Sequence, residues 1–390
     1  MDVLGIEALG DPGFEFCLRV MDRIYKFSPC LPDFMTMPYN PPELPLYCCH
    51  RGRNLWIDAF GVINFIALYK HDNNRFYLVC AAALVDAVHD TLGRSRDGTS
   101  RLPGATDQNP MKGGLRAGEM FEVDIFGDAS DCQDFLSLAM WMFALNHLSL
   151  CSGMARYSEY AVQLAVAIYP RFSLYGDNTG RLPQKLSIDL KPIHQTTNHT
   201  MSHLMTCLAV AIIRDVQATA LCFPHLDIPL VGEMRRCRTS LANVFRQCPT
   251  LTHCPDVYLV TNDPRVFMPH EQVRDLALRL FIGHHACDEP WGAEMVARAR
   301  EASYHFFSIL QGNVQFQEFR RAREQMELFL VAAAKYQPPL PRRRRDIDNM
   351  LIFWHDRVKV VSAEPSGGES DPAEMYMLYV AAQMDASMFT

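Results

Sequence analysis

Lysine is scarce in this chain of 390 residues, which has seven lysines against thirty arginines, and Asp and Glu (44) outnumber Lys and Arg (37). The net charge of −7 excludes a protein that coats nucleic acid through bulk positive charge, so any phosphate contact must be a local patch. Arginine suits such a patch because its guanidinium is planar and always charged. A GC-rich coding sequence is the simpler explanation of the arginine excess.

Paired cysteine spacing and a secretory leader are also missing. The thirteen cysteines are odd in number and scattered, and no stretch near the amino terminus has the charged, apolar and small-residue order of a signal peptide. The sequence therefore predicts buried, reduced thiols and a location in the cytosol or the nucleus.

The usual sequence signatures of catalysis and metal binding are absent. There is no Gly-x-Ser-x-Gly nucleophile motif, and the stretch "MKGGLRAGE" lacks the Gly-Lys-Ser/Thr ending of a phosphate-binding loop. The His- and Cys-containing stretches 248–254 and 283–294 lack the two-residue gaps typical of structural zinc sites. We therefore expect no catalytic residues, no metal and no cofactor, and a protein that is not an enzyme.

The most apolar window, residues 135–154, contains Asn146 and His147 and follows helix-capping residues. This pattern predicts a helix in a protein core rather than a membrane span, so we expect no membrane contact.

The remaining pattern is mostly helical and predicts two lobes. Residues 1–45 are expected to form an extended, proline-rich arm, and residues 46–185 an N-terminal lobe. Within this lobe we expect a β-hairpin at 56–80, turned at His71–Asn74, a mobile basic loop at 94–118, and helices. Residues 186–340 are expected to form a helical C-terminal lobe and residues 341–390 a second arm. The predicted fold class is mainly α, with two helical lobes, a small β-hairpin element in the N-terminal lobe and extended terminal arms.

Clusters of basic residues are the strongest remaining signal for function. Several converging arginines could hold single-stranded RNA while the rest of the surface stays acidic, although triple-basic runs on long helices are usually a solvated face. The candidate nucleic-acid-binding residues are Arg235, Arg236, Arg238, Arg298, Arg320, Arg321, Arg323, Arg342, Arg343, Arg344, Arg345, Lys112 and Arg116.

Four consecutive arginines, Arg342 to Arg345, follow a proline-rich stretch and allow three interpretations. They could be a nuclear localisation patch, a phosphate contact, or a segment that docks on the acidic surface of a neighbouring subunit. The flanking Asp346 and Asp348 weaken the first interpretation slightly.

In general layout the chain resembles the nucleoproteins of negative-strand RNA viruses. The stretches 140–164 and 299–310 are similar to aromatic helices of those proteins. The resemblance implies a structural protein that clamps single-stranded RNA between two helical lobes, forms homo-oligomers through its terminal arms, and resides in the virion and in the cytoplasm or nucleus of the host. Those proteins usually line the cleft with lysine as well as arginine, and lysine is scarce here.

Two alternatives remain open. The stretches "LYCC" (46–49) and "WIDAFGVINF" (56–65) are similar to signatures of a herpesvirus tegument and regulatory family, which implies an α/β interaction module. A viral capsid subunit would share the assembly role without needing an RNA groove.

Overall fold

The computed structural model describes residues 12–27, 39–43, 52–118, 131–175, 181–193, 199–226, 230–253, 270–312, 351–352, 354–356, 358 and 372–384. This part of the chain is mainly helical and contains one small antiparallel pair of strands, which confirms the predicted fold class at that level. The two strands are β1 (Cys132–Asp134) and β2 (Lys185–Ser187), with Gln133 opposite Leu186.

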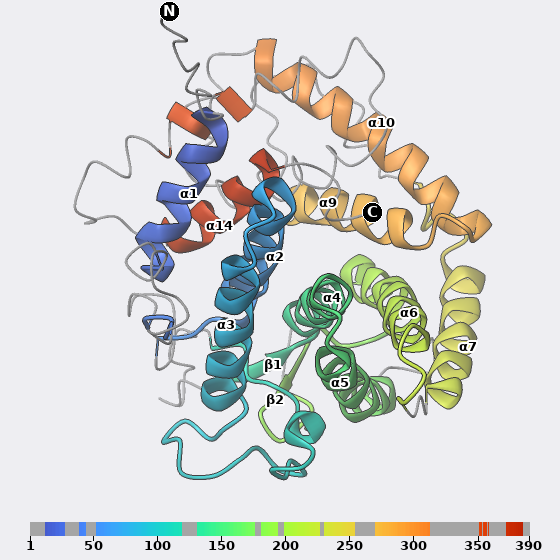
Figure 1. Cartoon of the computed structure of the whole chain (residues 1–390). Helices are drawn as coiled ribbons and strands as arrows, with labels where there is room; N and C mark the ends of the chain where they lie inside the picture. Colours follow the sequence, from blue (N-terminus) through green and yellow to red (C-terminus); the bar gives the residue numbers. More distant parts are fainter. Residues whose placement is uncertain are drawn as a thin grey trace, which may run out of the picture.

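The helices form an inner row covered by an outer row (Figure 1). In the inner row, α14 packs on α2, α2 on α4, α4 on α6, and α6 on α9. The inner helices are α2 (Leu55–Asp72), α4 (Phe135–Ser152), α6 (His199–Leu221), α9 (His270–His285) and α14 (Pro372–Gln383). The outer helices, which pack on the inner row, are α1 (Pro12–Tyr25), α3 (Phe76–Leu92), α5 (Ala155–Leu174), α7 (Val231–Gln247) and α10 (Pro290–Gly312).

The inner helices α2 and α4 are apolar on nearly every face because neighbours enclose them. In α2 every residue from Leu55 to Leu68 is buried, and in α4 every residue from Phe135 to Leu145. The helical segments Phe135–Ser152 and Met201–Leu221 are each long and apolar enough to cross a membrane, and most of each is buried inside the protein. Helix-on-helix packing in a two-layered fold explains this composition.

The prediction of a β-hairpin at 56–80 is wrong, because these residues form helix α2 and the start of helix α3. The turn between them was correctly located. Asn73 adopts a left-handed conformation (φ 58°) and donates its N–H to the Tyr69 carbonyl at 2.7 Å, which ends α2. Asn74 Oδ1 accepts the N–H of Phe76 at 3.0 Å at the start of α3. Because α2 is buried on all sides, its sequence is apolar throughout and lacks the helical periodicity that distinguishes a half-exposed helix from a buried strand.

The segments that connect an inner helix to the next outer helix differ in length from those that connect an outer helix to the next inner one. Short segments, such as 73–75 and 153–154, lead from an inner helix to the next outer helix. The segments that lead back to the inner row are longer, and β1 and β2 lie in two of them. The inner helices α2, α4, α6 and α9 therefore run in the same direction, each antiparallel to its outer partner.

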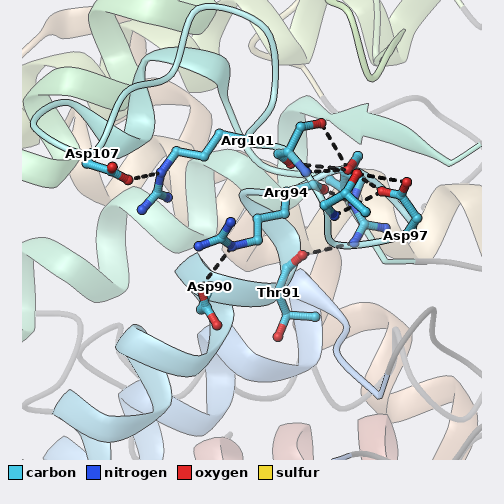
Figure 2. A network of polar contacts seen from close by, with 10 residues as sticks. Asp90, Thr91, Arg94, Asp97, Arg101 and Asp107 are labelled. Carbon is cyan, nitrogen blue, oxygen red and sulfur yellow. Dashed lines mark hydrogen bonds and ion pairs between the residues drawn. The ribbon is translucent and has the colours of Figure 1, made fainter.

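The segment 94–118, predicted to be mobile, is held by its own hydrogen bonds (Figure 2). Arg94 pairs with Asp90 at 2.9 Å and Arg101 with Asp107 at 2.8 Å. Asp97 accepts the N–H of Thr99 at 3.0 Å, and residues 94 and 101 form an antiparallel bridge. Polar side chains that bond to nearby backbone thus give this glycine-rich segment a defined shape.

Parts of both predicted terminal arms are helical and pack on the chain's own core rather than extending from it. Helix α1 packs on α14, and α14 packs on α2. Within the described residues 39–43 of the proline-rich stretch, the carbonyls of Pro41 and Pro42 accept hydrogen bonds from Arg53. Self-association through the arms stays a prediction, as does the lobe boundary near residue 186, across which α6 packs on α4 and α5.

Candidate functional site

A cleft of about 560 Å³ lies between α6 and α7. Eight of its lining residues belong to α7 and one, Gln217, to α6. The α7 residues are Val231, Met234, Arg235, Arg238, Thr239, Ala242, Asn243 and Arg246. Three arginines and no carboxylate line this cleft, so its local charge is positive although the whole chain is acidic.

A second cleft of about 470 Å³ adjoins the first and shares Gln217, Met234 and Arg238 with it. It reaches three ionisable side chains of the inner row, which are Arg214 and Asp215 of α6 and His285 of α9. Arg214 pairs with Asp288. We call the two together the α6–α7 cleft. It combines polar side chains from three helices with two titratable groups, the usual composition of a small-molecule site.

Asp215 is the carboxylate of the α6–α7 cleft. Asn146 of α4 donates from Nδ2 to Asp215 Oδ2 at 2.7 Å. Burial raises the pKa of Asp215 to about 6, because the surrounding helices remove water from the charged form, while the bond from Asn146 opposes this effect. The carboxyl group therefore changes its charge close to neutral pH.

His285 is held among aromatic rings of α4 and α9. Its ring centroid lies 5.0 Å from that of Phe143 and 4.5 Å from that of Phe281. Burial lowers the pKa of His285 to about 3, so its imidazole is neutral at physiological pH. Its Nε2 atom is buried and has no hydrogen-bond partner among the residues that the structure describes. A bound ligand could supply that partner.

The neighbouring His147 of α4 is also neutral. Its ring lies tilted against that of Phe143, with centroids 4.2 Å apart, and burial lowers its pKa to about 4. Asp215 can therefore take up a proton close to neutral pH, whereas both histidines stay neutral there. No group of three or more potential metal ligands was found in the described part of the chain.

Of the residues predicted from the sequence, Arg235 and Arg238 line the cleft. Arg236 lies on the same helix but pairs with Glu233 and does not line it. Sequence reasoning missed Arg246, although the spacing of 235, 238, 242 and 246 places all four on one face of a helix. It also missed Asp215, and it considered His285 only as part of a metal-binding stretch; both meet the arginines only through the fold.

The other predicted basic residues within the described ranges lie elsewhere. The side chain of Arg116 is 0% exposed, pairs with Asp131, and donates to the carbonyls of Arg94 at 2.7 Å and Thr91 at 3.0 Å. Lys112 is exposed on the short helix η2 (Pro110–Gly113). Arg298 is on α10 and pairs with Glu294 at 3.0 Å. Figure 1 shows the 94–118 segment, α7 and α10 at different sides of the molecule.

The remaining predicted residues lie outside the described ranges. They are Arg320, Arg321, Arg323, Arg342, Arg343, Arg344 and Arg345.

No family model matches the chain, and no curated protein matches its sequence. Solved structures with a similar arrangement of helices do exist. They include cellobiose 2-epimerase from Spirochaeta thermophila (TM-score 0.49, 10% identity, 98% of each chain covered). Others are cellobiose 2-epimerase from Bacillus thermoamylovorans (0.45, 11%, 94% of this chain and 99% of that one) and a GH76 α-mannanase from Bacteroides thetaiotaomicron (0.45, 9%, 95% and 94%). This likeness concerns the arrangement of helices and assigns no substrate.

These similar structures are carbohydrate-processing enzymes, which corrects the function predicted from the sequence. The prediction of a viral nucleoprotein that encapsidates RNA, with its tegument and capsid alternatives, is contradicted by this likeness, and so is the prediction that the protein is not an enzyme. The error arose from the assumption that distant arginines converge on one groove. Lys112, Arg116 and Arg298 do not line the α6–α7 cleft.

Proposed function

We propose that this protein is an enzyme that moves a proton on a small polar substrate bound in the α6–α7 cleft. One observation carries the proposal: Asp215, a carboxyl group with a pKa near 6, and His285, a neutral imidazole, line the same cleft. A base is most effective when its pKa is close to the working pH. Asp215 meets this condition.

The two side chains suit different roles. The Asp215 carboxylate, ionised above about pH 6, would take a proton from a carbon next to a substrate carbonyl. The electron pair left by that C–H bond would move onto the carbonyl oxygen. His285 would donate a hydrogen bond to that oxygen, since a neutral imidazole has one N–H donor. Return of the proton to the opposite face of the same carbon, once the enolate has turned over in the cleft, would complete an epimerisation. Return of the proton to the former carbonyl carbon, with the proton of the neighbouring hydroxyl passing to the former carbonyl oxygen, would complete an isomerisation.

The test is exchange of substrate hydrogen with solvent. The protein would be incubated in D₂O with a panel of sugars that includes mannose, cellobiose and their phosphorylated forms, and deuterium on carbon would be measured by proton NMR. We expect exchange with the wild-type protein and a loss of at least roughly 100-fold in the Asp215→Asn variant, because an amide cannot act as the base.

Asp90→Asn is the matched control. Asp90 is exposed on α3, pairs with Arg94 and does not line the cleft. Exchange by Asp90→Asn at the wild-type rate is expected. Equal rates in wild type and Asp215→Asn would rule out Asp215 as the base.

A further inference from the structure

We infer that the arginine stripe on α7, made of Arg235, Arg238 and Arg246, binds a phosphate group of the substrate. This inference rests on the proposed function, because it names the substrate class of the same cleft. All three side chains are exposed and line the cleft, and they follow one face of the helix together with Thr239.

The charge balance of the stripe points to an anionic ligand. Arg235 has no ion pair or side-chain hydrogen bond with any residue in the described ranges, and Arg246 donates only to the neutral Oδ1 of Asn243, at 2.9 Å. Arg238 lies 3.7 Å from Glu289 Oε1, too far for a strong hydrogen bond. Three guanidinium groups thus line the 560 Å³ part of the cleft, which has no carboxylate on its lining, whereas Asp215 lies in the adjoining part.

A contrast on the same helix strengthens this argument. Arg236 has its own carboxylate partner, Glu233, which is one turn earlier on α7 and is buried. The side chain that faces away from the cleft is therefore neutralised within the protein, whereas the cleft-facing Arg235 and Arg246 are not. An external anion is the missing counterpart.

The number and type of donors favour phosphate over carboxylate. A phosphate monoester carries close to two negative charges at neutral pH and three acceptor oxygens, and guanidinium forks bind such oxygens in pairs. Thr239 and Asn243 add neutral hydrogen-bonding groups between the arginines. A cleft of about 560 Å³ has the size of a small-molecule pocket, so we infer a phosphorylated metabolite.

The test measures binding of inorganic phosphate to the full-length protein by isothermal titration calorimetry. We expect saturable binding to the wild type that weakens as KCl is raised, because salt screens the arginines. Replacement of one charged hydrogen-bonding partner should weaken binding roughly 10-fold in Arg235→Gln or Arg246→Gln, and the double variant should bind more weakly still. Arg236→Gln is the control on the same helix and should bind like the wild type. Circular dichroism checks that each variant is folded.

The outcomes separate this inference from the proposed function. Asp215→Asn should bind phosphate normally although its exchange activity is lost. If phosphate fails to bind, or binds equally to the Arg235→Gln/Arg246→Gln double variant, the phosphate site is wrong while Asp215 can still be the base. Tighter binding of acetate than of phosphate, or binding of polynucleotide alone, would also overturn the inference.

Discussion

Asn146 Nδ2 donates a 2.7 Å hydrogen bond to Asp215 Oδ2, and this bond joins the inner helices α4 and α6 beside the cleft. The two residues are 69 positions apart in the sequence. Burial pushes the pKa of Asp215 upward, whereas the amide donor stabilises the charged carboxylate and limits the rise. Asn146 therefore acts on Asp215 as a positioning residue that also sets its protonation.

Replacing Asn146 should shift the titration of Asp215. In Asn146→Ala the carboxylate loses its amide donor, so the pKa of Asp215 should rise above its wild-type value of about 6. The rise would be followed by ¹³C NMR of labelled aspartate. If Asp215 catalyses exchange, the pH-rate profile should move to higher pH by the same amount. Gln163→Ala removes a half-buried amide of α5 that donates to Glu159 and does not line the cleft, so it should leave both measurements unchanged. An unshifted titration in Asn146→Ala would remove Asn146 from this role.

His89 should make the protein sensitive to acid. Trp141 donates from Nε1 to His89 Nε2 at 3.1 Å, and burial lowers the pKa of His89 to about 3. The folded state therefore keeps His89 neutral, while the unfolded chain takes up a proton near pH 6.5. Above pH 6.5 His89 is neutral in both states and costs no stability. As pH falls from 6.5 towards 3, the free energy of unfolding decreases by about 1.4 kcal/mol per pH unit, because only the unfolded chain takes up the proton.

The His89→Gln variant tests this dependence, because glutamine offers an acceptor to Trp141 but does not titrate. The free energy of unfolding would be measured with urea between pH 7 and pH 4 and plotted against pH. The slope of this plot should be smaller in the variant than in the wild type by the equivalent of about one proton taken up on unfolding. His71→Gln, at the exposed end of α2, is the control. Parallel slopes in wild type and His89→Gln would mean that His89 is not held neutral.

Arg116 should matter for stability. Its side chain is fully buried with Asp131, which is 1% exposed, so removing the guanidinium leaves a buried carboxylate unpaired. Arg116→Leu should lower the free energy of unfolding by about 3–5 kcal/mol. Arg101→Leu breaks an ion pair whose aspartate, Asp107, is 92% exposed, and should cost less than about 1 kcal/mol. Chemical denaturation measures the free energy of unfolding of both variants. Similar losses of stability in Arg116→Leu and Arg101→Leu would contradict the larger role given to the buried pair.

Gly292 should resist substitution because the first turn of α10 lies close against the segment that follows α9. A Cβ atom at this position would lie 2.1 Å from the carbonyl oxygen of Ala286. Gly292→Ala should therefore cost roughly 1–3 kcal/mol, since backbone must move to relieve the overlap. At Gly232 the nearest atom, the end of the Arg236 side chain, is 4.0 Å away, so Gly232→Ala should be neutral or slightly stabilising. Melting temperatures of both variants decide the matter, and a tolerated Gly292→Ala would refute the close approach.

The sequence predicts local features of this fold better than long-range ones. The apolar helix at 135–152, the turn at His71–Asn74 and the helices that begin at Pro290 or end near Gly283 follow from composition, capping and proline or glycine signals. The all-round burial of α2 was not predictable, because it depends on neighbours distant in the chain. For the same reason the arginines of α7 could be singled out, but not their proximity to Asp215 and His285.

The contact between helices α2 and α14 determines how late in synthesis the helical core can be completed. Asn64 of α2 donates from Nδ2 to the backbone carbonyl of Met377 in α14, at 2.9 Å and 313 positions further along the chain. A ribosome that has released α2 must therefore still synthesise most of the remaining polypeptide before this contact can form. Until then the buried faces of α1 and α2 lack their covering helix, so the nascent chain exposes apolar surface of the kind that chaperones bind.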